Sequence, residues 1–184
     1  MQAACCGTGV VRTTGCVWAC VAFAGVVNAA DFERHALAYD LGASAVRHVK
    51  QYRVDVGDVP KHVLRLYDLR RTFARNPPTF EGVRAVECLE RGVSDLVDDS
   101  GTESGYVIFV LEDGNRIVGR YSGSASSRHW PDGSRHYDLR GTIELTGGTG
   151  RFERIRGAVQ VWQALDPGAD SSQGAAEGSY WFER

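Results

Sequence analysis

The side chains of this 184-residue chain that are best suited to chemistry are carboxylates and tyrosine hydroxyls within strand-like segments. A carboxylate can remove a proton or stabilise a positive charge, and a nearby hydroxyl can polarise a substrate oxygen. The candidates for catalysis are Glu90, Tyr106, Tyr121 and Glu144. The candidates for ligand contact are Tyr67, Cys88, Arg120, Trp130 and Trp162. The competing interpretation of each carboxylate is a solvent-facing strand residue or an arginine partner, because most charged side chains are exposed or paired.

Other kinds of chemistry find weaker support in the sequence. Cys88 has no histidine at a spacing typical of a thiol nucleophile, which favours a small buried filler. His129 and His136 could approach one metal ion, but a site needs a third ligand, and no spacing assigns Asp132 or Asp138 to that role. A serine hydrolase would require a Gly-x-Ser-x-Gly turn, which is missing. We therefore expect neither a metal nor a cofactor.

The segments that must position these side chains have the pattern of β-strands. Residues 62–73 alternate so that Arg65, Tyr67 and Arg71 share one face of a long strand. Further strands are expected at 83–89, 105–111, 116–122, 139–145, 155–164 and 178–182. The strongest hairpin signal is Asp113-Gly114, between two apolar runs. A short helix is expected near residues 43–51, and a flexible loop over 166–174.

Seven or eight strands without long helices predict an all-β protein, a single antiparallel eight-stranded closed β-barrel. Closure removes the edge strands that could pair with other chains. The interior of such a barrel holds side chains or one small ligand. Parity alone leaves open which face of each strand lines that interior. For residues 105–111 we favour the face of Tyr106, with the apolar face of Val107 and Phe109 packed outward.

The first thirty residues have the order of a secretory signal peptide. Arg12 is their only charged residue, an apolar run covers 17–27, and small residues follow at Ala29 and Ala30. The apolar run is shorter than the about 20 residues of a membrane-spanning helix, although a retained anchor is the alternative. We expect residues 1–29 to be removed and residues 30–184 to form a single secreted or periplasmic domain, without stable membrane insertion after processing. Of five cysteines, only Cys88 would remain, which excludes an internal disulfide.

The charge balance limits the class of partner. The chain carries 21 Lys and Arg against 23 Asp and Glu, a net charge of −2, with the signs interspersed. Such a balance argues against nucleic acid or an anionic membrane surface as the main partner.

A glycine-dense turn at 147–150 leads into an alternating strand instead of a helix, which argues against a phosphate-binding loop. The segment 147–157 reads Gly-Gly-Thr-Gly-x-Phe-x-x-Ile-x-Gly and resembles that of the allene oxide cyclase and dirigent barrel group. Segments 56–60, 76–83, 92–95 and 105–106 are similar to those of the bacterial secreted relatives of that group. The resemblance covers residues 54–162.

This resemblance implies a calycin-like barrel that encloses a small hydrophobic molecule of lipid, terpenoid or polyketide type. It implies cofactor-independent isomerisation or cyclisation, in which a buried acid steadies a developing cation. A non-catalytic secreted carrier and a dirigent-like stereochemical guide are the alternatives, so whether the protein is an enzyme stays open. The resemblance also implies a homo-oligomer. The family's catalytic residues do not align with a motif in this chain, and none is transferred.

Overall fold

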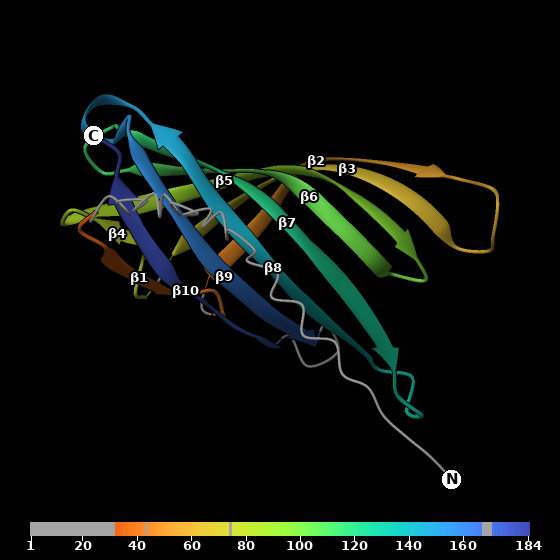
Figure 1. Cartoon of the computed structure of the whole chain (residues 1–184). Helices are drawn as coiled ribbons and strands as arrows, with labels where there is room; N and C mark the ends of the chain where they lie inside the picture. The colour runs from red at the N-terminus through yellow and green to blue at the C-terminus, as the bar shows by residue number, and fades with distance from the viewer. Residues whose placement is uncertain (1–31, 43, 74, 167–170) are drawn as a thin grey trace, which may run out of the picture. The chain divides into compact units, whose positions relative to one another are not determined.

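The computed structural model describes residues 32–42, 44–73, 75–166 and 171–184, most of which lie in antiparallel strands (Figure 1). The strands are β1 His35–Asp40, β2 Ser44–Asp55, β3 His62–Phe73, β4 Thr79–Phe80, β5 Val83–Val97, β6 Ser100–Leu111, β7 Arg116–His129, β8 Arg135–Gly148, β9 Ile155–Asp166 and β10 Ser171–Phe182. A 3-10 turn, η1 (Gly150–Phe152), follows β8. Within these ranges no helix is long and apolar enough to cross a membrane. The expected signal peptide, residues 1–29, lies outside the described residues.

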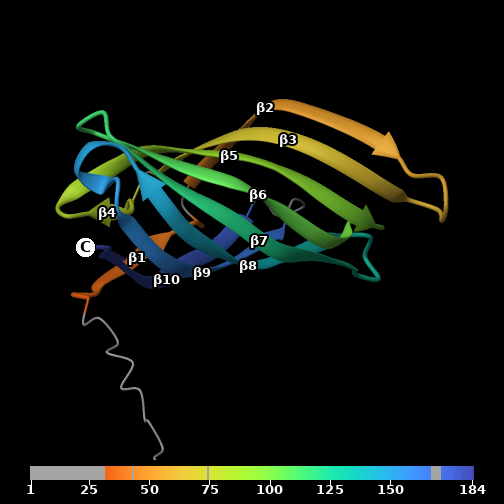
Figure 2. The same cartoon turned by 45° about the horizontal axis from the view of Figure 1, so that its top comes forward.

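The strands form one curved sheet in the order β1-β10-β9-β8-β7-β6-β5-β3-β2, with β4 paired to β5 beside this path (Figures 1 and 2). The predicted all-β antiparallel architecture is confirmed. The sheet has ten strands, where the sequence pattern indicated eight. The described strand pairs include none between β1 and β2, the two ends of the path.

The helix expected near residues 43–51 is wrong, because residues 44–55 form β2 and pair with β3. The side chains of residues 45–55 are all exposed. A strand is predicted from alternating apolar and polar residues, and this alternation arises when one face of the strand is buried. Because residues 45–55 of β2 have no buried face, their sequence lacks that alternation. The loop expected over 166–174 is also partly wrong, because β10 begins at Ser171; residues 167–170 lie outside the described part of the chain.

An aromatic core fills one end of the concave face. Phe80, Phe109 and Phe152 have no exposed surface, and the buried ring of Tyr180 on β10 packs against Phe80, with ring centres 5.5 Å apart. Each such side chain contributes roughly 1.5–3 kcal/mol on burial. Figure 2 shows β4 and the turn that contains η1 at the same end of the sheet as the C-terminus. Because that end is packed, room for a ligand lies further along the concave face.

Candidate functional site

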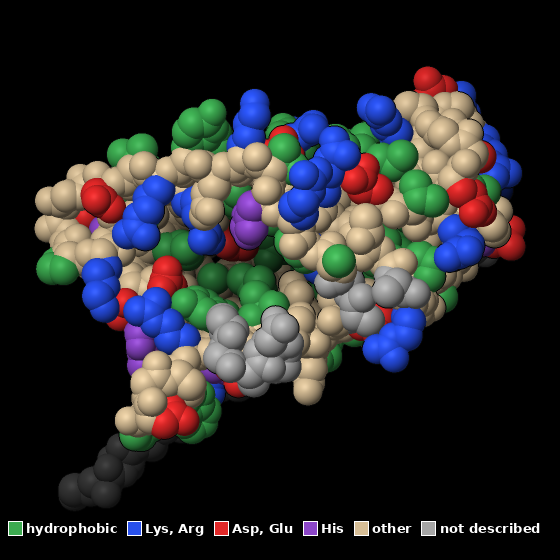
Figure 3. Space-filling view, turned by 180° about the vertical axis from the view of Figure 1, so that it is seen from behind, with side chains coloured by type: hydrophobic (Ala, Val, Ile, Leu, Met, Phe, Trp, Pro, Cys, Tyr) green, Lys and Arg blue, Asp and Glu red, His purple; other side chains and the backbone are tan. Residues whose placement is uncertain are grey.

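A cavity of about 460 Å³ lies inside the curved sheet, next to the aromatic core. Figure 3 shows a hollow with hydrophobic side chains at its base. Its apolar lining includes Leu69, Phe73, Val107, Ile143, Val161 and Leu165. Volumes of 300–1,000 Å³ with mostly apolar walls are typical of sites for small molecules.

A buried arginine crosses this interior. Arg71 on β3 donates from Nε to Oε1 of Glu90 over 2.7 Å, and from Nη2 to Oε1 of Gln163 on β9 over 3.4 Å. Gln163 in turn donates to Oγ of Ser172 on β10 over 2.9 Å. Arg71 and Gln163 are only 7% and 8% exposed. Because β3 and β9 are not neighbours in the sheet, this network joins opposite walls of the cavity.

A second polar cluster lies on three adjacent strands. Arg65, Ser94 and Glu103 pair in register across β3, β5 and β6. Nη2 of Arg65 lies 3.3 Å from both Oγ of Ser94 and Oε1 of Glu103, and the Ser94 hydroxyl donates to the same Oε1 over 3.0 Å. Hydrogen bonds between an arginine and a carboxylate are stronger than those between neutral groups.

Tyr67 and Tyr121 line the cavity between these clusters. They belong to one row of directly paired residues, Tyr67, Gly92, Gly105 and Tyr121, that crosses β3, β5, β6 and β7. A Cβ at Gly92 would lie 2.6 Å from the Tyr67 hydroxyl, so the absent side chain leaves room for that hydroxyl. Burial raises the pKa of Tyr67 well above its ordinary value and that of Tyr121 to about 12, and the charge of Glu103 adds to both shifts. Both hydroxyls are therefore protonated donors at neutral pH.

Cys88 also lines the cavity, directly opposite Arg71 in the register. It is 2% exposed, and burial, followed by the negative charge of Glu90, raises the pKa of its thiol well above the ordinary value. Since the thiolate is the reactive form, this environment makes Cys88 a poor nucleophile.

Four of the residues selected from the sequence have side chains on the concave face: Tyr67, Cys88, Glu90 and Tyr121. Tyr106 and Trp162 border the cavity, but the residues on either side of each in its strand face inward. Tyr106 is 52% exposed and Trp162 is 44% exposed. Their side chains therefore lie on the outer face.

The face of β6 that we favoured for the cavity, that of Tyr106, is thus the outer one. Val107 and Phe109 are 4% and 0% exposed, because an apolar face gains most by leaving water.

Three other selected residues do not reach the cavity. Arg120 and Glu144 are exposed and pair in register across β7 and β8, and the Arg120 guanidinium lies 5.7 Å from the ring centre of Tyr106. Trp130 is 54% exposed in the β7–β8 turn.

Five residues of the two polar clusters were not among those selected from the sequence: Arg65, Arg71, Ser94, Glu103 and Gln163. A usable signal existed for the arginines, since both share the face of Tyr67 in the alternation of residues 62–73. Nothing in the local pattern near Ser94 or Glu103 indicates that they meet.

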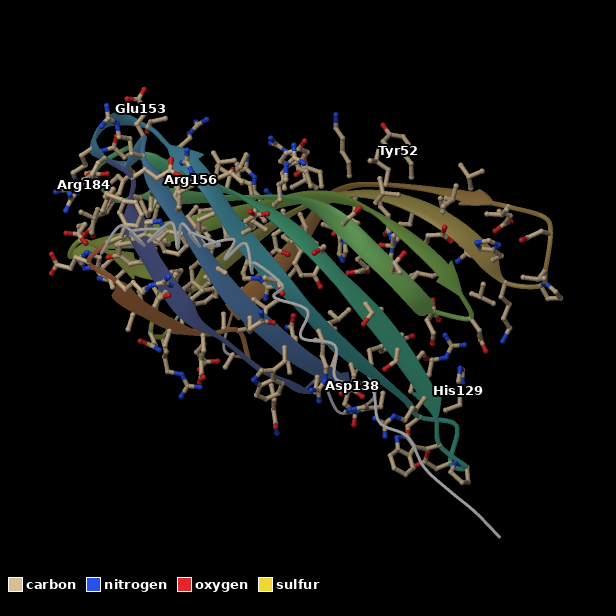
Figure 4. All side chains as sticks on the ribbon, in the orientation of Figure 1. Tyr52, His129, Asp138, Glu153, Arg156 and Arg184 are labelled. Carbon is tan, nitrogen blue, oxygen red and sulfur yellow. The ribbon has the colours of Figure 1, made fainter. Side chains whose placement is uncertain are left out.

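Within the described ranges, no group of three His, Cys, Asp or Glu side chains is placed to hold a metal ion. His129 and His136 lie on facing strands near the β7–β8 turn. His129 and Asp138 are labelled in Figure 4. His129 lies 4.0 Å from Asp98, and His136 lies 3.6 Å from Asp138.

Comparison of the chain with models of protein families, with curated proteins and with solved structures found no match. Chemically, the site combines apolar walls, two carboxylates held by arginines and two protonated phenols. Such a site can hold an apolar molecule and polarise an oxygen on it.

Proposed function

We propose that this protein binds one small, mostly apolar molecule in the cavity of its sheet. The observation that carries this proposal is a cavity of about 460 Å³ whose apolar walls bear a few convergent polar groups. The proposal agrees with the resemblance to the allene oxide cyclase and dirigent barrel group, and includes a secreted or periplasmic location.

We propose further that the sheet acts as a barrel of that type, with side chains joining its walls. The contact between Arg71 and Gln163 supports this, as does the edge-on packing of Tyr39 on β1 against Phe73 on β3, with ring centres 5.8 Å apart. Strands at opposite ends of the sheet order are thus joined through the interior. According to this proposal, these contacts close the cavity where β1 faces β3, without a bound ligand.

A second candidate is isomerisation or cyclisation of the bound molecule without a cofactor. Glu90 and Glu103 beside the phenols of Tyr67 and Tyr121 favour it, because an ionised carboxylate can take a proton from carbon while a phenol stabilises negative charge on an adjacent oxygen. Return of the same proton to another carbon completes an isomerisation with no change of oxidation state. The carboxylates already accept hydrogen bonds from arginines, which occupy one oxygen of each, so binding remains the leading proposal. A carrier or a dirigent-like guide would use the cavity without turnover.

The binding proposal can be tested with a neutral fluorescent probe. Val161→Trp fills the cavity from β9, whereas Gln160→Trp places the same ring on the exposed outer face of the same strand. We expect Nile red to bind the wild-type protein and Gln160→Trp with similar affinity, and to bind Val161→Trp at least about tenfold more weakly. Circular dichroism must show that both variants fold. Equal affinity for the two folded variants would contradict the proposal.

The catalytic candidate needs the natural ligand. Native mass spectrometry of protein from its own host, followed by organic extraction, would identify it. Turnover of that molecule should fall in Glu90→Gln and Glu103→Gln and persist in Glu144→Gln, whose side chain lies on the outer face. Unchanged turnover in both Glu90→Gln and Glu103→Gln would contradict catalysis by these carboxylates, and binding would be the only proposed function left.

A further inference from the structure

We infer that the ligand is uncharged and carries an acceptor oxygen, such as that of a ketone, aldehyde, ester or ether, which accepts a hydrogen bond from the hydroxyl of Tyr67 or Tyr121. This inference rests on the proposed binding function and specifies the chemical class of the ligand. It distinguishes an oxygenated neutral molecule from a hydrocarbon and from a fatty acid of similar size.

The two hydroxyls are donors that the protein itself does not use. Both residues line the cavity, and neither hydroxyl forms a hydrogen bond with another group in the described part of the chain. Each ring is fixed over glycine: Gly92 accommodates the Tyr67 hydroxyl, and Gly123 and Gly141 accommodate the ring of Tyr121. A fixed donor at an apolar wall lowers the cost of burying an acceptor oxygen, which otherwise loses its hydrogen bonds to water.

One oxygen of each cavity glutamate, in contrast, is already engaged by the protein. Oε1 of Glu90 accepts from Arg71, and Oε1 of Glu103 accepts from both Arg65 and Ser94. Nε of Arg65 is a further donor, buried without a hydrogen-bond partner among the described residues. The cavity therefore offers a ligand that accepts hydrogen bonds the two tyrosine hydroxyls, next to the unpartnered Nε of Arg65.

The charges of the cavity are also compensated. Arg71 pairs with Glu90, Arg65 with Glu103, and the third acid of the lining, Asp99, lies 2.9 Å from Arg135. A ligand carboxylate would enter a mostly apolar space in which each arginine already has a carboxylate partner. Burial of an uncompensated charge is costly, so an acid group should not be buried beside the tyrosines.

Three ten-carbon probes separate these possibilities: 2-decanone, decane and decanoate. Their affinities at pH 7 are measured by displacement of Nile red from the wild-type protein, from Tyr67→Phe/Tyr121→Phe and from Tyr52→Phe. Tyr52 is the matched control, because its side chain is 61% exposed on the outer face of β2 (Figure 4). We expect the double variant to bind 2-decanone about tenfold more weakly and decane within about twofold of wild type, since only the ketone loses hydrogen bonds. Tyr52→Phe should change neither affinity.

The wild-type protein supplies measurements that do not depend on the variants folding. Decanoate should bind at least about tenfold more weakly than 2-decanone. The carbonyl stretching frequency of bound 2-decanone should fall below its value in hexane, as expected for a hydrogen-bonded carbonyl.

An unshifted carbonyl, decanoate binding as tight as that of the ketone, or equal losses for ketone and decane in a folded double variant would each overturn this inference. In all three cases Nile red and decane still bind, so the proposed binding function survives. Failure of Nile red to bind the wild-type protein would instead contradict the proposed function itself.

Discussion

Arg71 on β3 donates a hydrogen bond across the interior of the sheet to Gln163 on β9, 92 positions further along the chain. The same guanidinium holds the carboxylate of Glu90. One side chain thus connects two strands that do not pair and orients an acid at the wall of the cavity.

Removal of this arginine should destabilise the fold. Arg71→Met leaves the half-buried Glu90 without its cation and Gln163 without a donor, and we expect a loss of about 3 kcal/mol in the free energy of unfolding measured with urea. Arg70→Met is the matched control, because Arg70 faces outward and pairs with Glu87. The side chains of Arg70 and Glu87 are 46% and 25% exposed. The control should cost less than about 1 kcal/mol. The double variant Arg71→Met/Glu90→Leu should regain part of the loss, and similar losses at Arg70 and Arg71 would argue against a structural role for the buried pair.

Gly92→Ala should affect both stability and binding. The new Cβ would meet the backbone oxygen of Ser104, which cannot move aside, and the Tyr67 hydroxyl, which must. We expect a cost of about 2 kcal/mol in urea unfolding and weaker binding of a ketone probe. Gly114→Ala provides the comparison: its φ of 84° strains alanine, but open space surrounds it, so about 1 kcal/mol should be lost with unchanged binding. Unchanged ketone affinity in Gly92→Ala would contradict the claim that the position of the Tyr67 hydroxyl contributes to ketone binding.

Stability should depend on pH through His62. Its ring nitrogens lie 2.6 Å from Asp58 and 2.7 Å from Asp95, and hydrogen bonds to Asp95 and then Asp58 raise its pKa above the ordinary 6.5. A raised pKa in the folded state means that the contribution is complete below pH 6.5 and is lost as pH rises through the folded-state value. The hydrogen bond to His62 lowers the pKa of Asp58 below 3.8, so the contribution of that group is lost only as pH falls through the lowered value.

The difference in unfolding free energy between wild type and His62→Gln should therefore be larger at pH 5.5 than at pH 8.5. An NMR titration of the imidazole checks the same claim at the residue, with a midpoint above 6.5 that moves down in Asp95→Asn. A stability difference that is constant with pH would contradict this assignment.

Cys88 should resist alkylation in the folded protein. Its burial and raised pKa keep the thiol protonated and out of reach of reagents. We expect iodoacetamide to modify the peptide that contains Cys88 at least about 100-fold more slowly in native protein than in urea, as measured by mass spectrometry. Rapid modification of the native protein would identify an accessible, reactive thiol and reopen the nucleophile interpretation.

Local patterns determined much of the strand architecture. The alternation of residues 62–73 placed Arg65, Tyr67 and Arg71 on one face, and the structure confirms this, because one face of β3 is turned to the interior. Asp113-Gly114 indicated the β6–β7 turn, where Gly114 adopts a φ of 84°. These signals are readable because turn residues and one-sided burial act on neighbouring positions.

Tertiary structure decided which faces line the cavity and which side chains meet there. In β5 the pairing shifts between Ala85 and Glu87, so that Ala85 and Cys88 both face inward despite opposite parity; such a bulge leaves no clear mark in the sequence. The cluster of Arg65, Ser94 and Glu103 depends on the register of three strands, and the contact of Arg71 with Gln163 depends on the curvature of the whole sheet. Register and curvature are set by the packing of all the strands together, whereas the sequence of each strand specifies only its own alternation.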